Sequence, residues 1–95
     1  MASHRISHRD RRTLETLFGH PLAHNLAWSD ALHLVERTGT VRQEPNGRVL
    51  LTIGEHRHVF HEPRAKQLGP EDVKQLRKFL ETAGVTPDSV EVIDG

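Results

Sequence analysis

The chain contains no cysteine among its 95 residues. Disulfides and thiolate metal ligands are therefore excluded together, and any bound metal would need histidine, aspartate or glutamate ligands. The absence of cysteine also fits a reducing compartment. A chain of this length buries only about two-thirds of its unfolded surface, so we expect a single domain with one modest core.

Long apolar runs are also missing. No segment approaches the ~18 consecutive apolar residues that a membrane-spanning helix needs. The beginning of the chain, MASHRISHRDRR, lacks the apolar centre of a signal peptide. We therefore expect a soluble, cytoplasmic protein with no membrane partner.

The chain has no excess of charge of either sign. Its formal net charge is zero, so overall attraction gives no argument for a polyanionic partner. The distribution is nevertheless uneven, because residues 37–78 contain nine lysines or arginines and five acids. The charged residues after Val85 are all acids, namely Asp88, Glu91 and Asp94. A basic central region permits a nucleic-acid-binding face, and a mixed solvated surface is the alternative.

Two segments in the first half have the spacing of helices. Residues 7–18 begin with a capping pattern, Ser7 followed three residues later by Asp10. The second segment is followed by Gly39, at the position where a residue in the left-handed conformation often ends a helix. Its apolar residues recur at the helical intervals i, i+3, i+4 and i+7, as Trp28, Ala31, Leu32 and Val35. We expect the tryptophan to anchor the core; a platform for a base is the alternative interpretation.

The period then changes to two. Residues 40–43, 48–53 and 56–61 are predicted strands, separated by the turn signals Pro45-Asn46-Gly47 and Gly54-Glu55. This order predicts a three-stranded antiparallel meander, with helices packed on one face.

The last third contains one more predicted helix. It follows a loop at 66–69, begins at Pro70 and ends at Gly84. Its apolar stripe is Val73, Leu76, Leu80 and Ala83, with Phe79 beside it. A loose tail is expected from Thr86. The whole pattern predicts an α+β fold.

A two-residue turn at Gly54-Glu55 fixes which strand residues share a face. It pairs Ile53 with His56 and Arg48 with His61. Because side chains alternate, one face carries Val49, Leu51, Ile53, His56, His58 and Phe60, and the other carries Arg48, Leu50, Thr52, Arg57, Val59 and His61. The first is more apolar and should pack under the helices.

The segment GEHRHVFHEP contains three histidines, but alternation separates them. His56 and His58 are expected to pack beside Phe60, whereas His61 points to the opposite face. They cannot converge on one ion, and we predict neither a metal site nor a cofactor.

His61 is the candidate catalytic residue. It is expected on the exposed face opposite Arg48, with Arg57 on that face and with Arg64 and Lys66 following in the chain. Metal-free RNA cleavage needs a base for the ribose 2′-OH and fixed cations for the phosphate. The four cations are therefore candidate RNA-binding residues. A solvent-facing polar strand is the alternative.

Five short motifs occur in an order that is typical of one family. They are Thr13-Leu14-Glu15-Thr16-Leu17-Phe18; Trp28; Asn46-Gly47-Arg48-Val49; Phe60-His61-Glu62-Pro63; and Leu76-Arg77-Lys78-Phe79-Leu80-Glu81-Thr82-Ala83-Gly84-Val85. Over about residues 9–86 the chain resembles a divergent branch of the HicA toxins. These are small mRNA interferases of toxin-antitoxin systems, with an α-β-β-β-α fold similar to the double-stranded RNA-binding domain.

The resemblance implies an organisation and a partner. Residues 1–25 would form an extra N-terminal helix and loop, residues 26–85 the HicA-like core, and residues 86–95 an acidic tail. RNA and a HicB-like antitoxin would be the partners. HicA toxins typically carry Gly-Ser-His where this chain has Gly47-Arg48-Val49, so the family's catalytic histidine is not matched here. A metal-independent ribonuclease and a catalytically inactive RNA-binding or protein-binding module are both open.

Overall fold

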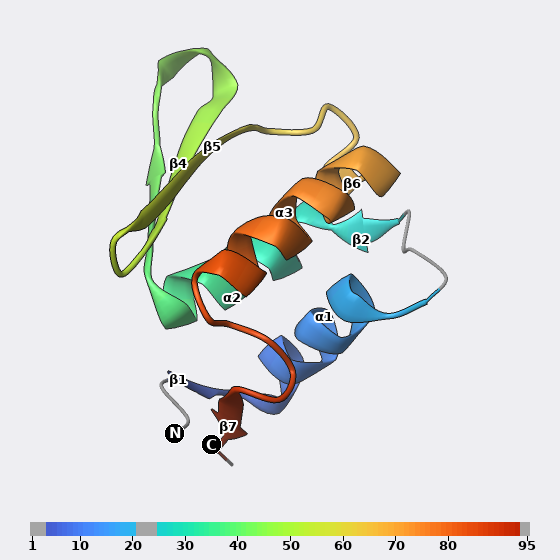
Figure 1. The fold of residues 1–95 in the computed structure, drawn as a ribbon. Coiled ribbons are helices and arrows are strands. Elements are labelled where there is room, and N and C mark those ends of the chain that lie inside the picture. Colours follow the sequence, from blue (N-terminus) through green and yellow to red (C-terminus); the bar gives the residue numbers. More distant parts are fainter. Residues whose placement is uncertain (1–3, 21–24, 94–95) are drawn as a thin grey trace.

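A computed structural model describes residues 4–20 and 25–93 of the chain, with three helices and a three-stranded antiparallel sheet (Figure 1). The helices are α1 (His8–Phe18), α2 (Trp28–Thr38) and α3 (Pro70–Thr82). The sheet is formed by β3 (Thr40–Gln43), β4 (Arg48–Ile53) and β5 (His56–His61), and the 3-10 turn η1 (Pro45–Gly47) joins its first two strands. The predicted α+β class is confirmed.

The first helix begins as the capping pattern predicts. Ser7 is its N-cap, and the Ser7 hydroxyl oxygen accepts a hydrogen bond from the backbone N–H of Asp10 at 3.2 Å. The far end of α1 is fixed by α3. Arg77 Nε donates to the carbonyl oxygen of Leu17 at 2.7 Å, and its terminal nitrogen donates to that of Gly19 at 3.0 Å. Arg77 is therefore a structural tie between the helices.

Gly39 ends α2 for a different reason from the one predicted. Its φ of −164° is extended, so the expected left-handed conformation was wrong. A Cβ at this position would lie 2.0 Å from the carbonyl oxygen of Thr52 in β4. Only glycine allows the chain to pass this close to the neighbouring strand.

The two turns of the meander adopt the conformations that their residues favour. Asn46 and Gly47 both have positive φ, at 71° and 75°. Gly54 has φ 59°, whereas Glu55 is not among the residues with positive φ, as a turn with glycine first requires. The resulting register pairs Arg48 with His61 and Ile53 with His56, which confirms the prediction from the turn.

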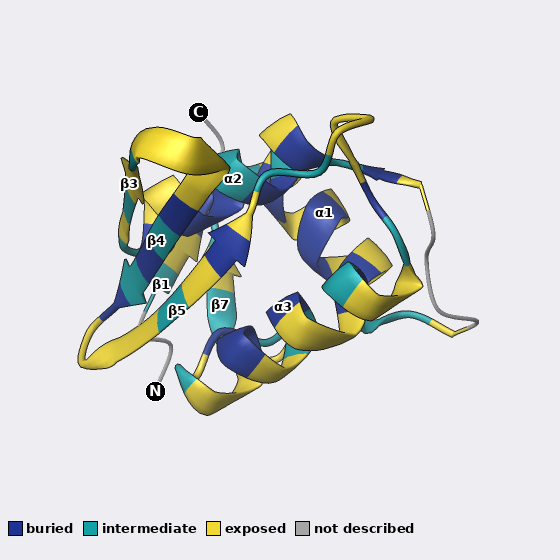
Figure 2. Cartoon of the chain, turned by 90° about the horizontal axis from the view of Figure 1, so that it is seen from above, coloured by how far each residue is buried: buried dark blue, intermediate teal, exposed yellow. Residues whose placement is uncertain are grey.

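The core lies between the helices and one face of the sheet, as Figure 2 shows by burial. Trp28 is only 3% exposed, and its ring centroid is 6.3 Å from that of Phe60, so it is a core anchor and not a platform for a base. In α2 the fully buried leucine is Leu34, while Leu32 is partly buried. The sheet contributes Val49, Leu51, Ile53 and Phe60 to the core.

Two small ribbons lie outside the main sheet. β1 (His4–Ile6) pairs in parallel with β7 (Val90–Val92), and β2 (Leu26–Ala27) pairs with β6 (Gln67–Leu68). The predicted loose tail and the loop at 66–69 were therefore wrong in these segments. Ile6 is fully buried, and Val90 and Val92 of the paired strand β7 also pack against the core. Figure 1 shows β1 and β7 side by side. Asp94 lies outside the described residues.

Candidate functional site

Side-chain alternation gives the main sheet two faces, and all residues of one of them are exposed or partly exposed. We call this the outer face. It consists of Thr40, Arg42, Arg48, Leu50, Thr52, Arg57, Val59 and His61. None of these residues is buried, and Val59 is the exposed large hydrophobic residue of the described chain. The outer face is therefore accessible to a partner.

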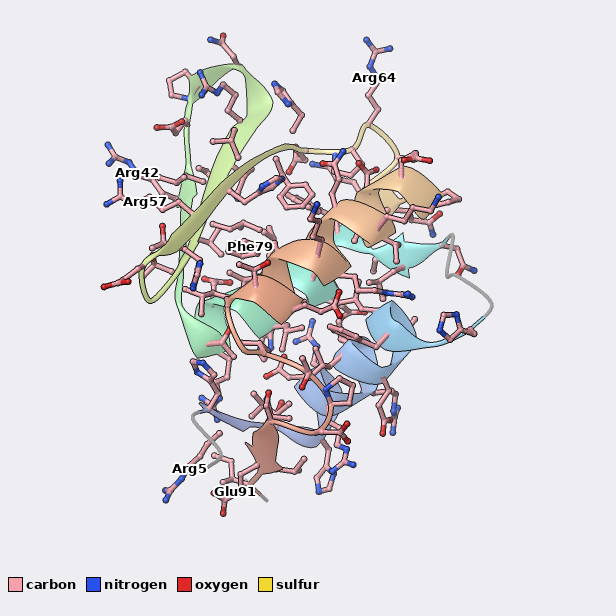
Figure 3. All side chains as sticks on the ribbon, viewed as in Figure 1. Arg5, Arg42, Arg57, Arg64, Phe79 and Glu91 are labelled. Atoms are coloured by element: carbon pink, nitrogen blue, oxygen red, sulfur yellow. The ribbon has the colours of Figure 1, made fainter. Side chains whose placement is uncertain are left out.

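The charge on the outer face is of one sign, because it contains three arginines and one histidine but no acid. Figure 3 shows Arg42 and Arg57 extending away from the helices. Arg42, Arg48 and Arg57 form no ion pair with any residue in the described part of the chain, whereas Arg9 lies 2.8 Å from Asp30. The three guanidinium groups are free to bind an anion.

His61 lies directly opposite Arg48 in the β4–β5 pair, and its side chain is exposed. Arg57 shares the face but is not an immediate neighbour, because Val59 lies between it and His61 along β5. At the rise of a strand, four residues separate their backbones by about 13 Å. A phosphate held by Arg48 would be next to the imidazole, and a second phosphate would be needed to engage Arg57.

The other two predicted cations lie elsewhere. Lys66 Nζ is 2.9 Å from Glu62 Oε2, so an acid already compensates its charge. Arg64 belongs to the loop after β5, and Figure 3 shows it pointing into solvent, apart from Arg42 and Arg57. Sequence reasoning omitted Arg42. Extending the alternation to β3, whose Arg42 pairs with Leu50, would have placed it on the outer face.

A buried aspartate bound to a histidine is a second feature that sequence reasoning missed. Asp10 of α1 is fully buried, and its Oδ2 accepts a hydrogen bond from the Ser7 hydroxyl at 3.0 Å. Its Oδ1 lies 2.6 Å from Nδ1 of His33 in α2. An ionised carboxylate has no proton to give, so the imidazole nitrogen donates. The contact ties the beginning of α1 to α2.

A hollow of about 460 Å³ opens between the β4–β5 hairpin and α3. We call it the hairpin hollow. Its lining consists of Glu55, His56, Arg57 and His58 from the hairpin and Gln75, Lys78, Phe79 and Thr82 from α3, and Glu55 is the one acid among them. His58 packs against Phe60 at 4.6 Å between ring centroids, which confirms its expected packing role. His56 is exposed, so the prediction that it packs in the same way was wrong. It lies at the hairpin tip, where the core ends.

No family model, curated protein or solved structure matches this chain. Its functional assignment therefore depends on the chemistry of the sites themselves. None of the described helices is both long and apolar enough to cross a membrane. Within residues 4–20 and 25–93, no three histidine or acidic side chains gather where they could hold a metal ion.

The outer face combines two chemical capabilities. Unpaired guanidinium groups bind phosphate oxygens through paired N–H donors. A neutral imidazole accepts a proton from a hydroxyl group held within hydrogen-bond reach. Arg48 and His61 place both capabilities side by side on neighbouring strands. This arrangement suits a ligand that carries a phosphate and a hydroxyl group close together.

Proposed function

We propose that the chain is a HicA-like RNA-binding protein of the cytoplasm that binds RNA phosphates on the outer face. The observation that carries this proposal is the set of three exposed arginines on a sheet face that has no acid. Phosphate contacts supply much of the affinity of proteins for nucleic acids. The order α2-β3-β4-β5-α3, interrupted between β5 and α3 only by the two-residue strand β6, supports the likeness to the double-stranded RNA-binding domain.

A HicB-like antitoxin is the proposed protein partner. It would bind the outer face and exclude RNA from it. Because the charged side chains of that face are basic, the antitoxin would present carboxylates to Arg42, Arg48 and Arg57. It would also cover Val59, which is 38% exposed. Competition between the antitoxin and RNA for the same residues would neutralise the toxin.

The enzymatic form of the proposal gives His61 the role of general base. It would take the proton of a ribose 2′-OH, whose oxygen then attacks the adjacent phosphorus and breaks the bond to the 5′-oxygen. The departing 5′-oxygen would take its proton from water. Arg48, directly opposite His61, would stabilise the negative charge that develops on the phosphate oxygens.

One observation favours a non-catalytic protein as the second candidate. Gly47-Arg48-Val49 stands where HicA toxins typically carry Gly-Ser-His, so a guanidinium replaces the family's hydroxyl group and a valine replaces its imidazole. Val49 is buried and contributes no chemistry to the outer face. In this form the protein binds RNA or a protein partner on the same face without cleaving RNA.

Binding is tested with the purified protein and a fluorescently labelled single-stranded RNA. The Arg48→Ala/Arg57→Ala double variant should bind at least about ten-fold more weakly than the wild type. The matched control is Arg11→Ala/Lys74→Ala, which removes two exposed positive charges that already face acids. Equal affinity of the first variant and the wild type would overturn the proposal.

Catalysis is tested by expressing the wild type, His61→Ala and the control His20→Ala in cells and following growth and RNA integrity. If the protein is an enzyme, expression of the wild type or of His20→Ala should arrest growth and cleave RNA. Expression of His61→Ala should do neither. Harmless expression of the wild type with intact RNA would reject the ribonuclease and leave the non-catalytic candidate. Cleavage by His61→Ala at the rate of the wild type would remove His61 from the mechanism.

A further inference from the structure

The hairpin hollow has an aromatic floor. The rings of His58 and Phe79 lie 5.8 Å apart between centroids, with 35° between their planes. Phe79 is 6% exposed and belongs to α3, whereas His58 is half-buried and comes from β5. The hollow volume of about 460 Å³ falls within the ~300–1,000 Å³ that is typical of small-molecule sites. The hollow is therefore large enough to receive a flat aromatic group beside these rings.

The rim of the hollow adds polar groups without partners of their own. Gln75 and Lys78 are exposed on α3, and neither side chain has a hydrogen bond or an ion pair with any described residue. The Gln75 amide offers both a donor and an acceptor to the edge of a flat heterocycle. The Lys78 ammonium offers a positive charge beside it. Such a combination suits a nucleobase that is attached to a phosphate.

The hollow and the outer face meet at one strand. β5 is an edge strand of the sheet, and its residues alternate between the two faces. His56 and His58 point toward the hollow, while Arg57 between them belongs to the outer face and also lies at the edge of the hollow. A chain of phosphates on the outer face could therefore pass over this edge and deliver a base into the hollow.

We propose that the hairpin hollow receives one unstacked base of a single-stranded RNA whose phosphates lie on the outer face. This inference rests on the proposed function and deepens it by naming the class of RNA. In a duplex the bases are paired and stacked, so none is available to lie on the His58 and Phe79 rings. Stacking on aromatic side chains is tolerant of base identity, since every base has a flat face.

The test compares two variants of the aromatic floor, His58→Leu and Phe79→Leu, which keep apolar volume but remove the rings. Circular dichroism establishes that each variant is folded. Each should bind a fluorescent single-stranded 12-nucleotide RNA about ten-fold more weakly than the wild type. The control His20→Leu should bind as tightly as the wild type. A 12-base-pair RNA duplex should bind more weakly than the single strand.

The outcomes separate this inference from the proposed function. If both floor variants bind the single strand within two-fold of the wild type, or if the duplex binds at least as tightly, the base site is overturned. The outer-face proposal survives that result as long as Arg48→Ala/Arg57→Ala still weakens RNA binding. The hollow would then be assigned to a side chain of a protein partner and not to a base. A wild type that binds no RNA overturns both.

Discussion

The variant His33→Ala should destabilise the fold, because it removes the hydrogen-bond partner of one carboxylate oxygen on a fully buried aspartate. Asp10 Oδ1 lies 2.6 Å from His33 Nδ1, and Oδ2 is bound separately by Ser7. A hydrogen bond to a charged group contributes ~1.5–3 kcal/mol. Since 44% of the His33 side chain is exposed, solvent screens the contact and the lower part of that range, about 1.5–2 kcal/mol, is expected.

Thermal unfolding followed by circular dichroism measures the loss. For a domain of this size, each kcal/mol lowers the Tm by ~4–8 °C, so His33→Ala should lower it by about 6–16 °C. The exposed control His20→Ala should stay within about 0.5 kcal/mol of the wild type. In the Asp10→Asn background, His33→Ala should cost much less, because the buried charge is gone. If His33→Ala and His20→Ala had the same Tm, the stabilising role assigned to the contact between Asp10 and His33 would be refuted.

Two further variants test how the elements are held together. Gly39→Ala should cost at least about 2 kcal/mol, because its Cβ would meet the Thr52 carbonyl oxygen at 2.0 Å. Urea unfolding measures this cost, and an unchanged midpoint would contradict the close approach. Arg77→Ala should cost about 1.5–3 kcal/mol, because two carbonyl oxygens at the end of α1 lose their donors. Arg77→Lys should not restore the loss, since an ammonium cannot reproduce the planar fork; full recovery would argue against this geometry.

Local signals were sufficient to predict the central hairpin. Gly54 fixes the turn, the turn fixes the register, and alternation then assigns each side chain to a face. The same alternation assigned His61 and His56 to opposite faces, and the register placed Arg48 beside His61. The helices followed from apolar spacing and caps. These features depend on residues that are close in the sequence, which is why they could be read without a structure.

The missed features depend on segments that are distant in the sequence. The β1–β7 ribbon joins Arg5 to Glu91, and three-residue strands carry too little pattern to reveal such a partner. The contact between Asp10 and His33 spans 23 residues and forms only because α1 and α2 pack together. The prediction of a left-handed conformation at Gly39 failed for the same reason. Glycine is needed there because β4 passes close to the backbone, not because the helix ends there.

The measurement that tests the central claim most directly is the salt dependence of RNA affinity. The logarithm of the association constant falls with the logarithm of salt concentration by ~0.7 for each phosphate contact with a single strand. The Arg42→Ala/Arg48→Ala/Arg57→Ala variant should therefore have a slope shallower than that of the wild type by about 2, whereas Arg11→Ala/Lys74→Ala should keep the slope of the wild type. Identical slopes for the triple variant and the wild type would show that RNA phosphates do not bind the outer face.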